Sequence, residues 1–479
     1  VRLLMRSGNP LQAESLDRVD YMRASSIILL SDPEQAKQRH FADITLVKTL
    51  LSMKAHAHAD VDDEDLPNVV IEINDPANKQ LAESAGWKHH TEAVASEEFI
   101  SRLFNQTIRH PGISELYTHL LTDTYGESLF LRRVDEVGLT GQSLRGAVHK
   151  FRDAIPIGFL KARASRFSHE ERLRILELDE KMEADDEIIC VAPSIRSIGE
   201  GFESQRETPP GHTPTEGLSE ISNLSDPAKR QSVMIVGWSP LVRPLLAEMG
   251  LYALDRFEVF VVTERPERDV LGDLRDIIER HDNLSIEAHQ SSLNRADEIR
   301  AVRPERFDRI VLLSPSFIED PLVADAETVM ATVLLARDLR EHGPEGGVPF
   351  VIELNDEDNQ PLLDLYGVRD TIVTQEIVSH LLSQVAVRRA LAWIYEELFT
   401  YGGTDVRLRP FRDLFEDPQL EDTTFEQVQT RCMSKGLVCI GFVFPERRGG
   451  FSPGTHLNPP RSESFVPELD DEMIVFERE

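Results

Sequence analysis

Residues 70–78 read Val-Ile-Glu-Ile-Asn-Asp-Pro-Ala-Asn, and residues 351–359 read Val-Ile-Glu-Leu-Asn-Asp-Glu-Asp-Asn. Each stretch is a short apolar run that ends in acidic and amide side chains. Gly86 and Gly367 follow the two stretches at the same distance. Because such matches at one offset rarely arise by chance, they indicate an internal duplication, and the duplication decides the architecture.

The matches extend outward from this stretch in the same order. Residues 26–31 match residues 309–314, residues 100–103 match residues 378–381, and residues 185–189 match residues 470–474. Tyr117 of the first copy falls opposite Tyr395 of the second. The chain is therefore interpreted as two copies of one unit.

The second copy shows the complete pattern of the unit. Apolar runs at 232–237, 257–263, 284–289, 310–314 and 350–354 predict strands, and the segments 241–249, 269–280, 296–302 and 320–340 between them predict helices. Strands that are apolar on both faces and alternate with helices are typical of a doubly wound parallel sheet. We therefore predict an α/β fold of tandem Rossmann-like domains, each followed by a small α+β domain.

The first copy is expected to be truncated at its N-terminus, because residues 1–6 align with the third strand of the second copy. A single helix is predicted after each Rossmann-like part, at 97–122 and 375–400. The predicted domains are a first Rossmann-like lobe (1–125), its α+β lobe (126–194), a flexible linker (195–231), a second Rossmann-like lobe (232–401) and its α+β lobe (402–479). The linker is assigned because residues 199–230 are rich in Pro, Gly, Ser, Thr and Glu.

Composition excludes several classes of protein. Lys and Arg total 52 against 84 Asp and Glu, a net charge of −32 that disfavours nucleic-acid binding. Three cysteines without a Cys-x-x-Cys pair predict neither a disulfide framework nor a zinc site. No apolar run approaches the roughly 20 residues that span a bilayer, so the chain itself is expected to have no transmembrane segment.

The turn after the first strand of the second copy is a candidate cofactor site. It reads Gly237-Trp238-Ser239-Pro240, and Glu264 ends the next strand, where an acid can hold ribose hydroxyls. A dinucleotide fingerprint needs further glycines, however, and Pro240 has no N–H donor. Nucleotide binding and a purely structural turn both remain open.

The repeated acidic motif is a candidate metal site. Oxygen ligands from Asp, Glu and Asn near strand ends suit calcium, which nominates Glu72, Asp75, Asn78, Glu353, Asp356 and Asn359. The alternative is that Asp75 and Asp356 cap helices, since Pro76 suits a first helical turn. No Ser/His/Asp or Cys/His arrangement stands out, so no catalytic residue and no enzyme are predicted.

Several of these segments together resemble one family. The stretch 70–75 with Asn78, the segment Arg-His-Pro-Gly at 109–112, the segment Ala-Ile-Pro-Ile-Gly at 154–158 and Val-Gly-Trp at 236–238 resemble the cytosolic region of CASTOR/POLLUX-type ion channels. The resemblance covers essentially the whole chain. The pore helices that this family carries upstream are not in this sequence.

The resemblance implies tandem regulator-of-potassium-conductance (RCK) domains that assemble as a homotetrameric gating ring. The ring would sit at the cytoplasmic face of a membrane, joined to a membrane-embedded pore in cis or in trans, and would bind calcium or a nucleotide. Ligand binding would shift the ring between conformations and so regulate cation transport. The alternatives are a soluble Trk-like subunit of a potassium uptake system and, with less support from the turn, an NAD(P)-dependent oxidoreductase.

Overall fold

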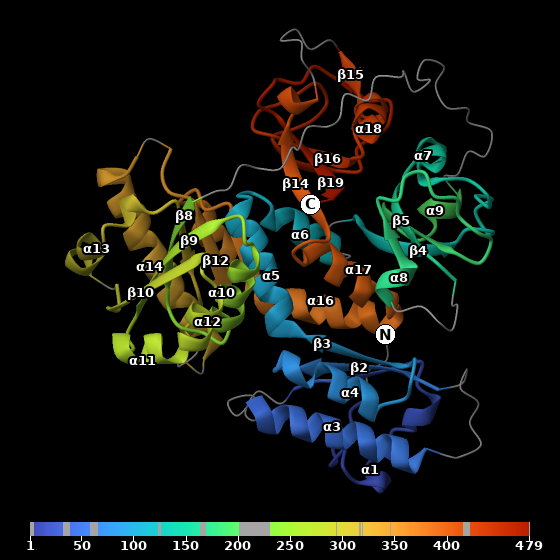
Figure 1. Cartoon of the computed structure of the whole chain (residues 1–479), viewed down its shortest axis with the longest axis horizontal. Coiled ribbons are helices and arrows are strands. Elements are labelled where there is room, and N and C mark those ends of the chain that lie inside the picture. Colours follow the sequence, from blue (N-terminus) through green and yellow to red (C-terminus); the bar gives the residue numbers. More distant parts are fainter. Residues whose placement is uncertain are drawn as a thin grey trace. The chain divides into compact units, whose positions relative to one another are not determined.

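A computed structural model describes residues 4–31, 39–57, 66–122, 126–162, 169–200, 230–293, 295–315, 318, 320–344, 346–414 and 422–478. The chain forms two compact units, one of Val1–Ser101 with Gln375–Tyr395 and the other of Arg102–Thr374 with Glu396–Glu479. Figure 1 colours both units along the sequence. Most of the predicted linker, residues 201–229, lies outside the described residues.

The larger unit contains a six-stranded parallel sheet in the order β10-β9-β8-β11-β12-β13. The strands are β8 (Arg230–Val236), β9 (Arg256–Thr263), β10 (Leu284–Gln290), β11 (Arg309–Leu312), β12 (Phe350–Leu354) and β13 (Asp370–Val373). The strand order reverses between β8 and β11. This is the doubly wound parallel sheet that the alternating pattern predicts, and the prediction is confirmed.

Helices follow the strands of this sheet as expected. They are α10 (Val242–Leu251), α11 (Glu267–Asp273), α12 (Arg275–Arg280), α13 (Ala296–Val302), α14 (Pro321–His342) and α15 (Gln360–Asp364). Helix α10 packs with α12, and α14 packs with α13 and α15. Leu335 and Leu339 of α14 join Met234, Ile310 and Ile352 of the strands in one buried core.

The smaller unit contains a three-stranded parallel sheet, β1 (Ser26–Leu29), β2 (Asn68–Ile73) and β3 (Thr91–Ala95). Helices α3 (Arg39–His56) and α4 (Lys79–Ala85) follow β1 and β2. Leu50 and Met53 of α3 pack in a core with Val69 and Ile71 of β2. The repeated motif lies on β2 and on β12, so β1, β2 and β3 correspond to β11, β12 and β13.

The expectation that residues 1–6 form a strand is wrong for its described part. Leu4–Arg6 belong to no strand, and the described residues before β1 form α1 (Ala13–Asp17) and the short 3-10 turn Tyr21–Arg23. The start of the sequence is a short apolar run, and an apolar run of that length does not by itself define a strand.

Each α+β domain is built on a four-stranded antiparallel sheet. The first is β4 (Ser128–Arg133), β7 (Glu187–Ala192), β5 (Ile155–Leu160) and β6 (Leu173–Ile175), in that order. The second, in the equivalent order, is β14 (Thr404–Pro410), β19 (Glu472–Arg478), β16 (Val438–Phe444) and β17 (Gly454–Leu457). The remaining elements include α7 (Leu144–Ala147), α8 (His169–Arg172), α9 (Ser197–Glu200), α18 (Phe425–Ser434), β15 (Thr423–Thr424) and β18 (Ser464–Phe465).

The two antiparallel sheets share an irregularity that confirms the duplication. The pairing register shifts before Gly158 in β5 and before Gly441 in β16. A Cβ atom at Gly158 would lie 2.5 Å from the carbonyl oxygen of Arg174, and one at Gly441 would collide with the carbonyl oxygen of His456. A glycine is therefore required at the same bulge in both copies.

Each predicted single helix after the Rossmann-like part is in fact a pair of helices with a bend. The pairs are α5 (Ser96–Arg109) with α6 (Ser114–Leu121), and α16 (Thr374–Val387) with α17 (Ala390–Phe399). In the first pair Pro111 has no N–H and Gly112 adopts φ +88°, so the helix ends there. Among the described residues, no helix combines the length and the apolar character needed to cross a bilayer.

Candidate functional site

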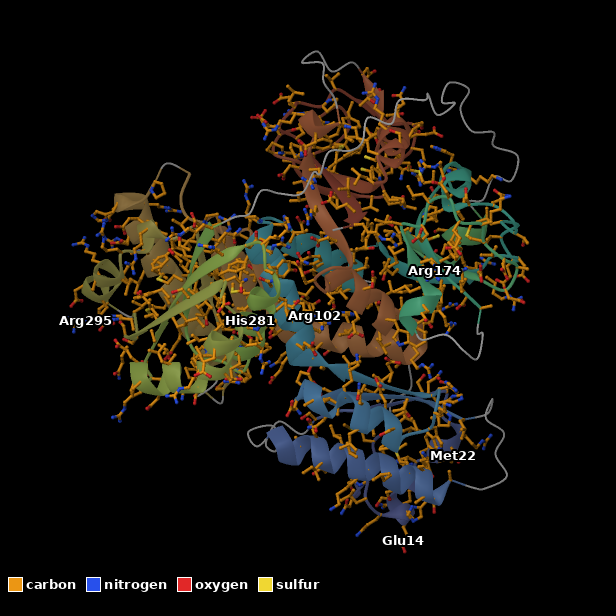
Figure 2. All side chains as sticks on the ribbon, viewed as in Figure 1. Glu14, Met22, Arg102, Arg174, His281 and Arg295 are labelled. Carbon is orange, nitrogen blue, oxygen red and sulfur yellow. The ribbon has the colours of Figure 1, made fainter. Side chains whose placement is uncertain are left out.

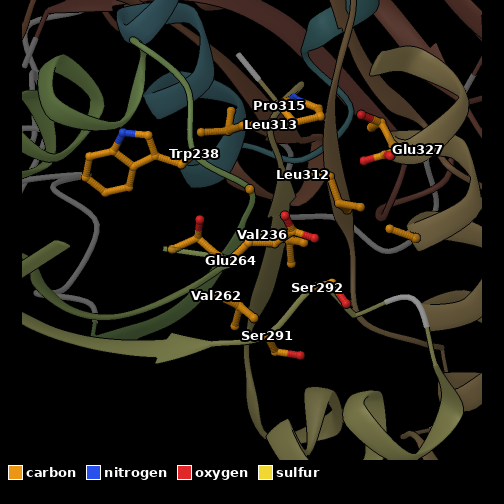
Figure 3. A pocket seen from close by; sticks show the side chains of 14 residues that line it. Val236, Trp238, Val262, Glu264, Ser291, Ser292, Leu312, Leu313, Pro315 and Glu327 are labelled. Atoms are coloured by element: carbon orange, nitrogen blue, oxygen red, sulfur yellow. The ribbon is translucent and has the colours of Figure 1, made fainter. Parts of the chain in front are cut away.

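The carboxyl ends of β8, β9 and β11 open into a pocket that is continuous with solvent (Figure 3). It lies where the strand order reverses, the position at which open α/β sheets bind ligands. The predicted residues Gly237, Trp238 and Glu264 line this pocket, and Ser239 is buried in the adjoining turn. The apolar ends of the strands form its floor, namely Val236, Val262, Leu312 and Leu313.

Gly237 has a structural reason to be glycine. Its φ is +97°, and a Cβ atom there would lie 2.5 Å from the carbonyl oxygen of Leu313. The close approach of β8 and β11 therefore requires this glycine whether or not a phosphate is ever bound.

The start of α10 offers few free donors for a phosphate. The Ser239 hydroxyl accepts a hydrogen bond from the Leu241 N–H at 3.2 Å, and the Ser239 carbonyl accepts one from the Val242 N–H at 3.2 Å. Pro240 and Pro244 carry no N–H. An anion-binding helix start needs several free N–H groups that point at the ligand, and here the turn itself engages those of Leu241 and Val242.

The rim of the pocket is acidic. Glu264 and Glu327 are exposed and approach from opposite sides in Figure 3. The described lining residues include no lysine, arginine or histidine. The nearby Arg265 lies over the Trp238 ring, 4.5 Å from its centroid, and pairs with Asp273. Carboxylates over an apolar floor suit a ribose diol or a cationic group better than a pyrophosphate.

The repeated acidic motif surrounds a carboxylate that the motif itself does not contain. In the second copy this is Asp325 of α14, which is fully buried. It accepts hydrogen bonds from the Asn355 N–H at 2.9 Å and side-chain amide at 2.8 Å. It also accepts them from the Asp356 N–H and the Asn359 side-chain amide, both at 3.0 Å. The N–H groups of the motif thus bind a buried aspartate, and this contact connects α14 to the end of β12.

The first copy repeats this arrangement around Asp43 of α3. Asp43 accepts from the Asn74 N–H at 2.9 Å, from the Asp75 N–H at 3.0 Å and from the Asn78 side-chain amide at 2.9 Å. Sequence reasoning missed both aspartates. The sequence did contain a signal for them, namely a nearly equal spacing. Asp43 and Asp325 lie 31 and 30 residues before the asparagine that each one binds.

The other predicted metal ligands are also engaged with the backbone. Glu72 accepts from the Ser31 N–H at 3.0 Å, and Glu353 accepts from the Ser314 N–H at 2.9 Å. These two contacts tie each motif strand to the strand beside it.

Asp75 and Asp356 cap the turns that follow them, accepting from the N–H groups of Ala77 and Asp358 at 3.0 Å. Within the described part of the chain no group of three or more His, Cys, Asp or Glu side chains is placed to hold a metal ion. Calcium binding at Glu72, Asp75, Asn78, Glu353, Asp356 and Asn359 stays a prediction.

A buried arginine on α5 is a further residue that sequence reasoning did not single out for a role. The Arg109 side chain is 9% exposed, and its Nε lies 3.3 Å from Asp255 and its Nη1 3.9 Å from Asp405. Its guanidinium lies over the Tyr252 ring at 3.9 Å. Arg109 therefore joins α5 to the entrance of β9 and to β14 within the larger unit.

Arg102, labelled in Figure 2, lies two turns before Arg109 on the same helix. Its side chain is 12% exposed and sits 3.8 Å from carboxylate oxygens of Glu248 and of Glu396. Between these two arginines, Gln106 donates to the Tyr252 hydroxyl at 3.2 Å. Polar residues at this helical spacing predict a solvated face, yet here they are buried against other parts of the unit.

Comparison with known proteins supports the family resemblance. A family model described as "Castor and Pollux, part of voltage-gated ion channel" matches residues 97–206. The chain is 22% identical over an alignment of 520 residues to the "Probable ion channel POLLUX" of Oryza sativa subsp. japonica, covering 99% of this chain and 49% of that protein. It is 24% identical over 518 residues to the "Ion channel DMI1" of Medicago truncatula, covering 99% of this chain and 54% of that protein.

A solved structure supports the fold. The structure of the human SLO3 gating ring superposes with a TM-score of 0.70 at 15% sequence identity, covering 99% of this chain and 91% of that one. The chain spans about half the length of the curated relatives that it matches. The predicted resemblance to the CASTOR/POLLUX-type ion channels is confirmed over 99% of the chain, and its tandem α/β fold is that of a solved gating ring.

Proposed function

We propose that this chain is the regulatory, gating-ring region of a cation channel similar to CASTOR and POLLUX, acting at the cytoplasmic face of a membrane and coupling ligand binding to ion transport. One observation carries the proposal. The tandem fold matches a gating ring over nearly the whole chain, while its sequence aligns with proteins named as ion channels. Catalysis is not part of the proposed role, since the relatives are named as channels.

The pocket at the carboxyl edge of the larger sheet is the proposed ligand site. Its apolar floor suits a flat ring system, and Glu264 directly follows β9, where an acid can hold a ribose diol. Because Pro240 and Pro244 lack an N–H and the Leu241 and Val242 N–H groups are already engaged, a nucleotide would be held mainly through its nucleoside part. A ligand acts on the ring only by the difference between its affinities for two conformations.

A thermal-shift titration of the full chain tests this site. Adenosine, ATP and NAD are each expected to raise the unfolding midpoint by several degrees at about a hundred times the dissociation constant, which is worth about 2.7 kcal/mol. Glu264→Gln should weaken the shift for all three, because the diol loses its charged acceptor.

Glu258→Gln is the matched control, because Glu258 lies on the same strand but pairs with Arg230 near the strand's amino end. It should leave the ligand shift unchanged. Calcium, which the acidic motif predicts as a ligand, belongs in the same titration. The ligand-sensing proposal for this chain is rejected when none of the four compounds shifts the midpoint.

A second copy of the chain is the partner that the surface supports, in line with a homotetrameric ring. Leu322 and Met330 of α14 are 62% and 60% exposed, and Leu362 of α15 is 47% exposed. We call these residues the α14–α15 face. Leu81 of α4, the equivalent of Leu362, is likewise 56% exposed. The exposed leucine that recurs in both copies, together with the exposed apolar side chains of α14, favours self-association.

Charge placed on the α14–α15 face is therefore expected to reduce assembly. The double variant Met330→Glu with Leu362→Glu should shift the chain toward monomer in size-exclusion chromatography with light scattering, because buried charge opposes association. Glu279→Lys, an exposed position on α12, is the control and should leave the mass unchanged. An unchanged mass in the double variant would contradict assembly through this face.

A further inference from the structure

The three-stranded sheet of the smaller unit has an edge that no described strand covers. Among the described strands, β1 pairs only with β2, whereas its equivalent β11 pairs with β12 on one side and with β8 on the other. The described elements before β1, namely α1 and the turn Tyr21–Arg23, match α13 and the turn Pro304–Arg306 in order and spacing. Within the described residues, the smaller unit therefore has no counterpart of β8, α10 or β9.

Apolar side chains at this edge are exposed, whereas their equivalents in the larger unit are buried. Ile28 is 40% exposed and Leu30 is 61% exposed. Their equivalents Val311 and Leu313 are 0% and 2% exposed, and the Leu313 N–H donates to the carbonyl oxygen of Val236 in β8 at 2.9 Å. An apolar edge strand of this kind is a template on which another strand can pair.

In the larger unit, the sheet holds the helix pair of the first copy. Asp370 of β13 accepts a hydrogen bond from the Gly112 N–H at 2.7 Å, at the bend between α5 and α6. Arg309, at the start of β11, donates from Nε to the carbonyl oxygen of Ile108 at 3.1 Å. Helix α5 therefore ends against the sheet of the second copy.

In the smaller unit, the sheet holds the helix pair of the second copy in the same way. Glu92 of β3 accepts a hydrogen bond from the Trp393 indole N–H at 3.0 Å, beyond the bend between α16 and α17. Ser26, at the start of β1, donates from its hydroxyl to the carbonyl oxygen of Ala386 at 2.6 Å. These last two residues match the arginine and the isoleucine of the larger unit in the sequence, so α16 has in the smaller unit the place that α5 has in the larger one.

The exposed surface continues from β1 onto α16. In the larger unit, Asn105 of α5 is fully buried, and the Arg109 side chain is 9% exposed, with its Nε 3.3 Å from Asp255 in the corner between α10 and β9. The equivalent residues of α16 are Ser383 and Val387, and both are exposed. Val387 is the extreme case, with 79% of its surface exposed. The same helix face is thus covered in one unit and open in the other.

We propose that Ile28, Leu30, Ser383 and Val387, together called the β1–α16 surface, form the docking site of a strand–helix–strand segment of the β8–α10–β9 type. Its first strand adds to β1 in parallel, and its corner between helix and second strand lies on Val387. A second copy of the chain is not the occupant, because its own β8–α10–β9 segment is paired within its own sheet. The docking site is a property of this chain and does not rest on the proposed channel function.

The equivalent contacts of the larger unit specify the chemistry of the docking segment. Its first strand is apolar on both faces, as in buried parallel strands. The strand ends in glycine, because a Cβ atom at Gly237 would lie 2.5 Å from the carbonyl oxygen of Leu313. The corner carries an apolar residue in place of Asp255, because Val387 replaces Arg109 and a carboxylate buried there would have no cation.

Thiol labelling of the full chain tests the docking site. The three native cysteines are buried, so Leu30→Cys supplies an accessible thiol. A second copy of residues 230–263, carrying Asp255→Leu, is joined ahead of residue 1 by a flexible Gly/Ser linker. Docking of this added segment is expected to slow maleimide labelling of the introduced thiol by about tenfold or more, because the linker holds the segment at a high effective concentration.

Val387→Asp in the extended chain gives the sharper test. The side chain is largely exposed, so the variant should fold, but a charge on the surface opposes the apolar corner and should restore fast labelling. Val466→Asp, at an exposed valine of the larger unit, is the matched control and should keep the protection. A thiol introduced by Leu81→Cys on α4 should be labelled at the same rate with and without the added segment.

Three outcomes would overturn the proposal. In the first, the added segment leaves the labelling rate of the Leu30→Cys chain unchanged. In the second, the protection survives Val387→Asp. In the third, the Leu30→Cys chain without the added segment is labelled more slowly as its concentration rises, which would identify a second copy as the occupant of the β1–α16 surface.

Discussion

Replacing Asp325 by alanine is expected to lower the free energy of unfolding of the larger unit by about 3–5 kcal/mol, the cost of removing one partner of a buried charged network. Asp325 is fully buried and accepts from two backbone N–H groups and from two side-chain amides. The alanine variant leaves these partly buried donors without the acceptor that they have in the native chain. Thermal unfolding should show a midpoint lower by many degrees.

The matched control for this prediction is Glu279→Ala, which removes an exposed carboxylate from α12. It should leave the midpoint nearly unchanged, because exposed charges contribute little to stability. Asp43→Ala in the first copy should behave like Asp325→Ala, since Asp43 has the same partners. A loss below about 1 kcal/mol in Asp325→Ala would show that the motif does not depend on its aspartate.

Replacing Arg109 by methionine is expected to destabilise the larger unit by a similar amount, about 3–5 kcal/mol, because a buried ion pair loses one partner. Methionine keeps the apolar part of the side chain, but Asp255 then stays buried without the guanidinium group that Arg109 supplies. Asp405 retains Arg407, whose Nε lies 3.0 Å away. Denaturant unfolding of the full chain measures the loss.

A double-mutant cycle separates the ion pair from the packing of the arginine stem. Asp255→Asn in the Arg109→Met background should recover part of the loss, since no uncompensated carboxylate then remains at that position. Arg133→Met is the control, because Arg133 pairs with Asp135 and Asp185 at the surface. Additive losses for Arg109→Met and Asp255→Asn would show that the two side chains are not coupled.

Much of the fold could be predicted from local pattern. Apolar runs such as 257–263 and 350–354 predict buried parallel strands, and both were found as β9 and β12. The end of α5 also has a local cause in the sequence, because Pro111 and Gly112 follow it directly. The bend between α16 and α17 has no such local cause. Arg388 and Arg389 occupy it, and Arg389 lies beside Glu92, a residue far away in the sequence.

The candidate site could be predicted only in part, for a related reason. The sequence placed Gly237 and Glu264 at strand ends, and both line the pocket. It could not show that the Ser239 hydroxyl and carbonyl satisfy the donors that a phosphate would need. The acidic motif looked like a set of metal ligands because acidic and amide oxygens are visible in sequence. The buried aspartate that engages the motif's donors is on another element.

By itself the sequence determined the duplication, the α/β class, the strands of the second copy's parallel sheet and the family resemblance, because these depend on periodicity and on short-range matches. Only the tertiary structure decided which carboxylates are buried, that Asp325 and Asp43 anchor the repeated motif, and that each sheet holds the helix bend of the other copy. These depend on which distant side chains share a desolvated space. A charged side chain in such a space needs a hydrogen-bonding or oppositely charged partner. The local sequence pattern shows neither which side chains lose water nor which partner they bind.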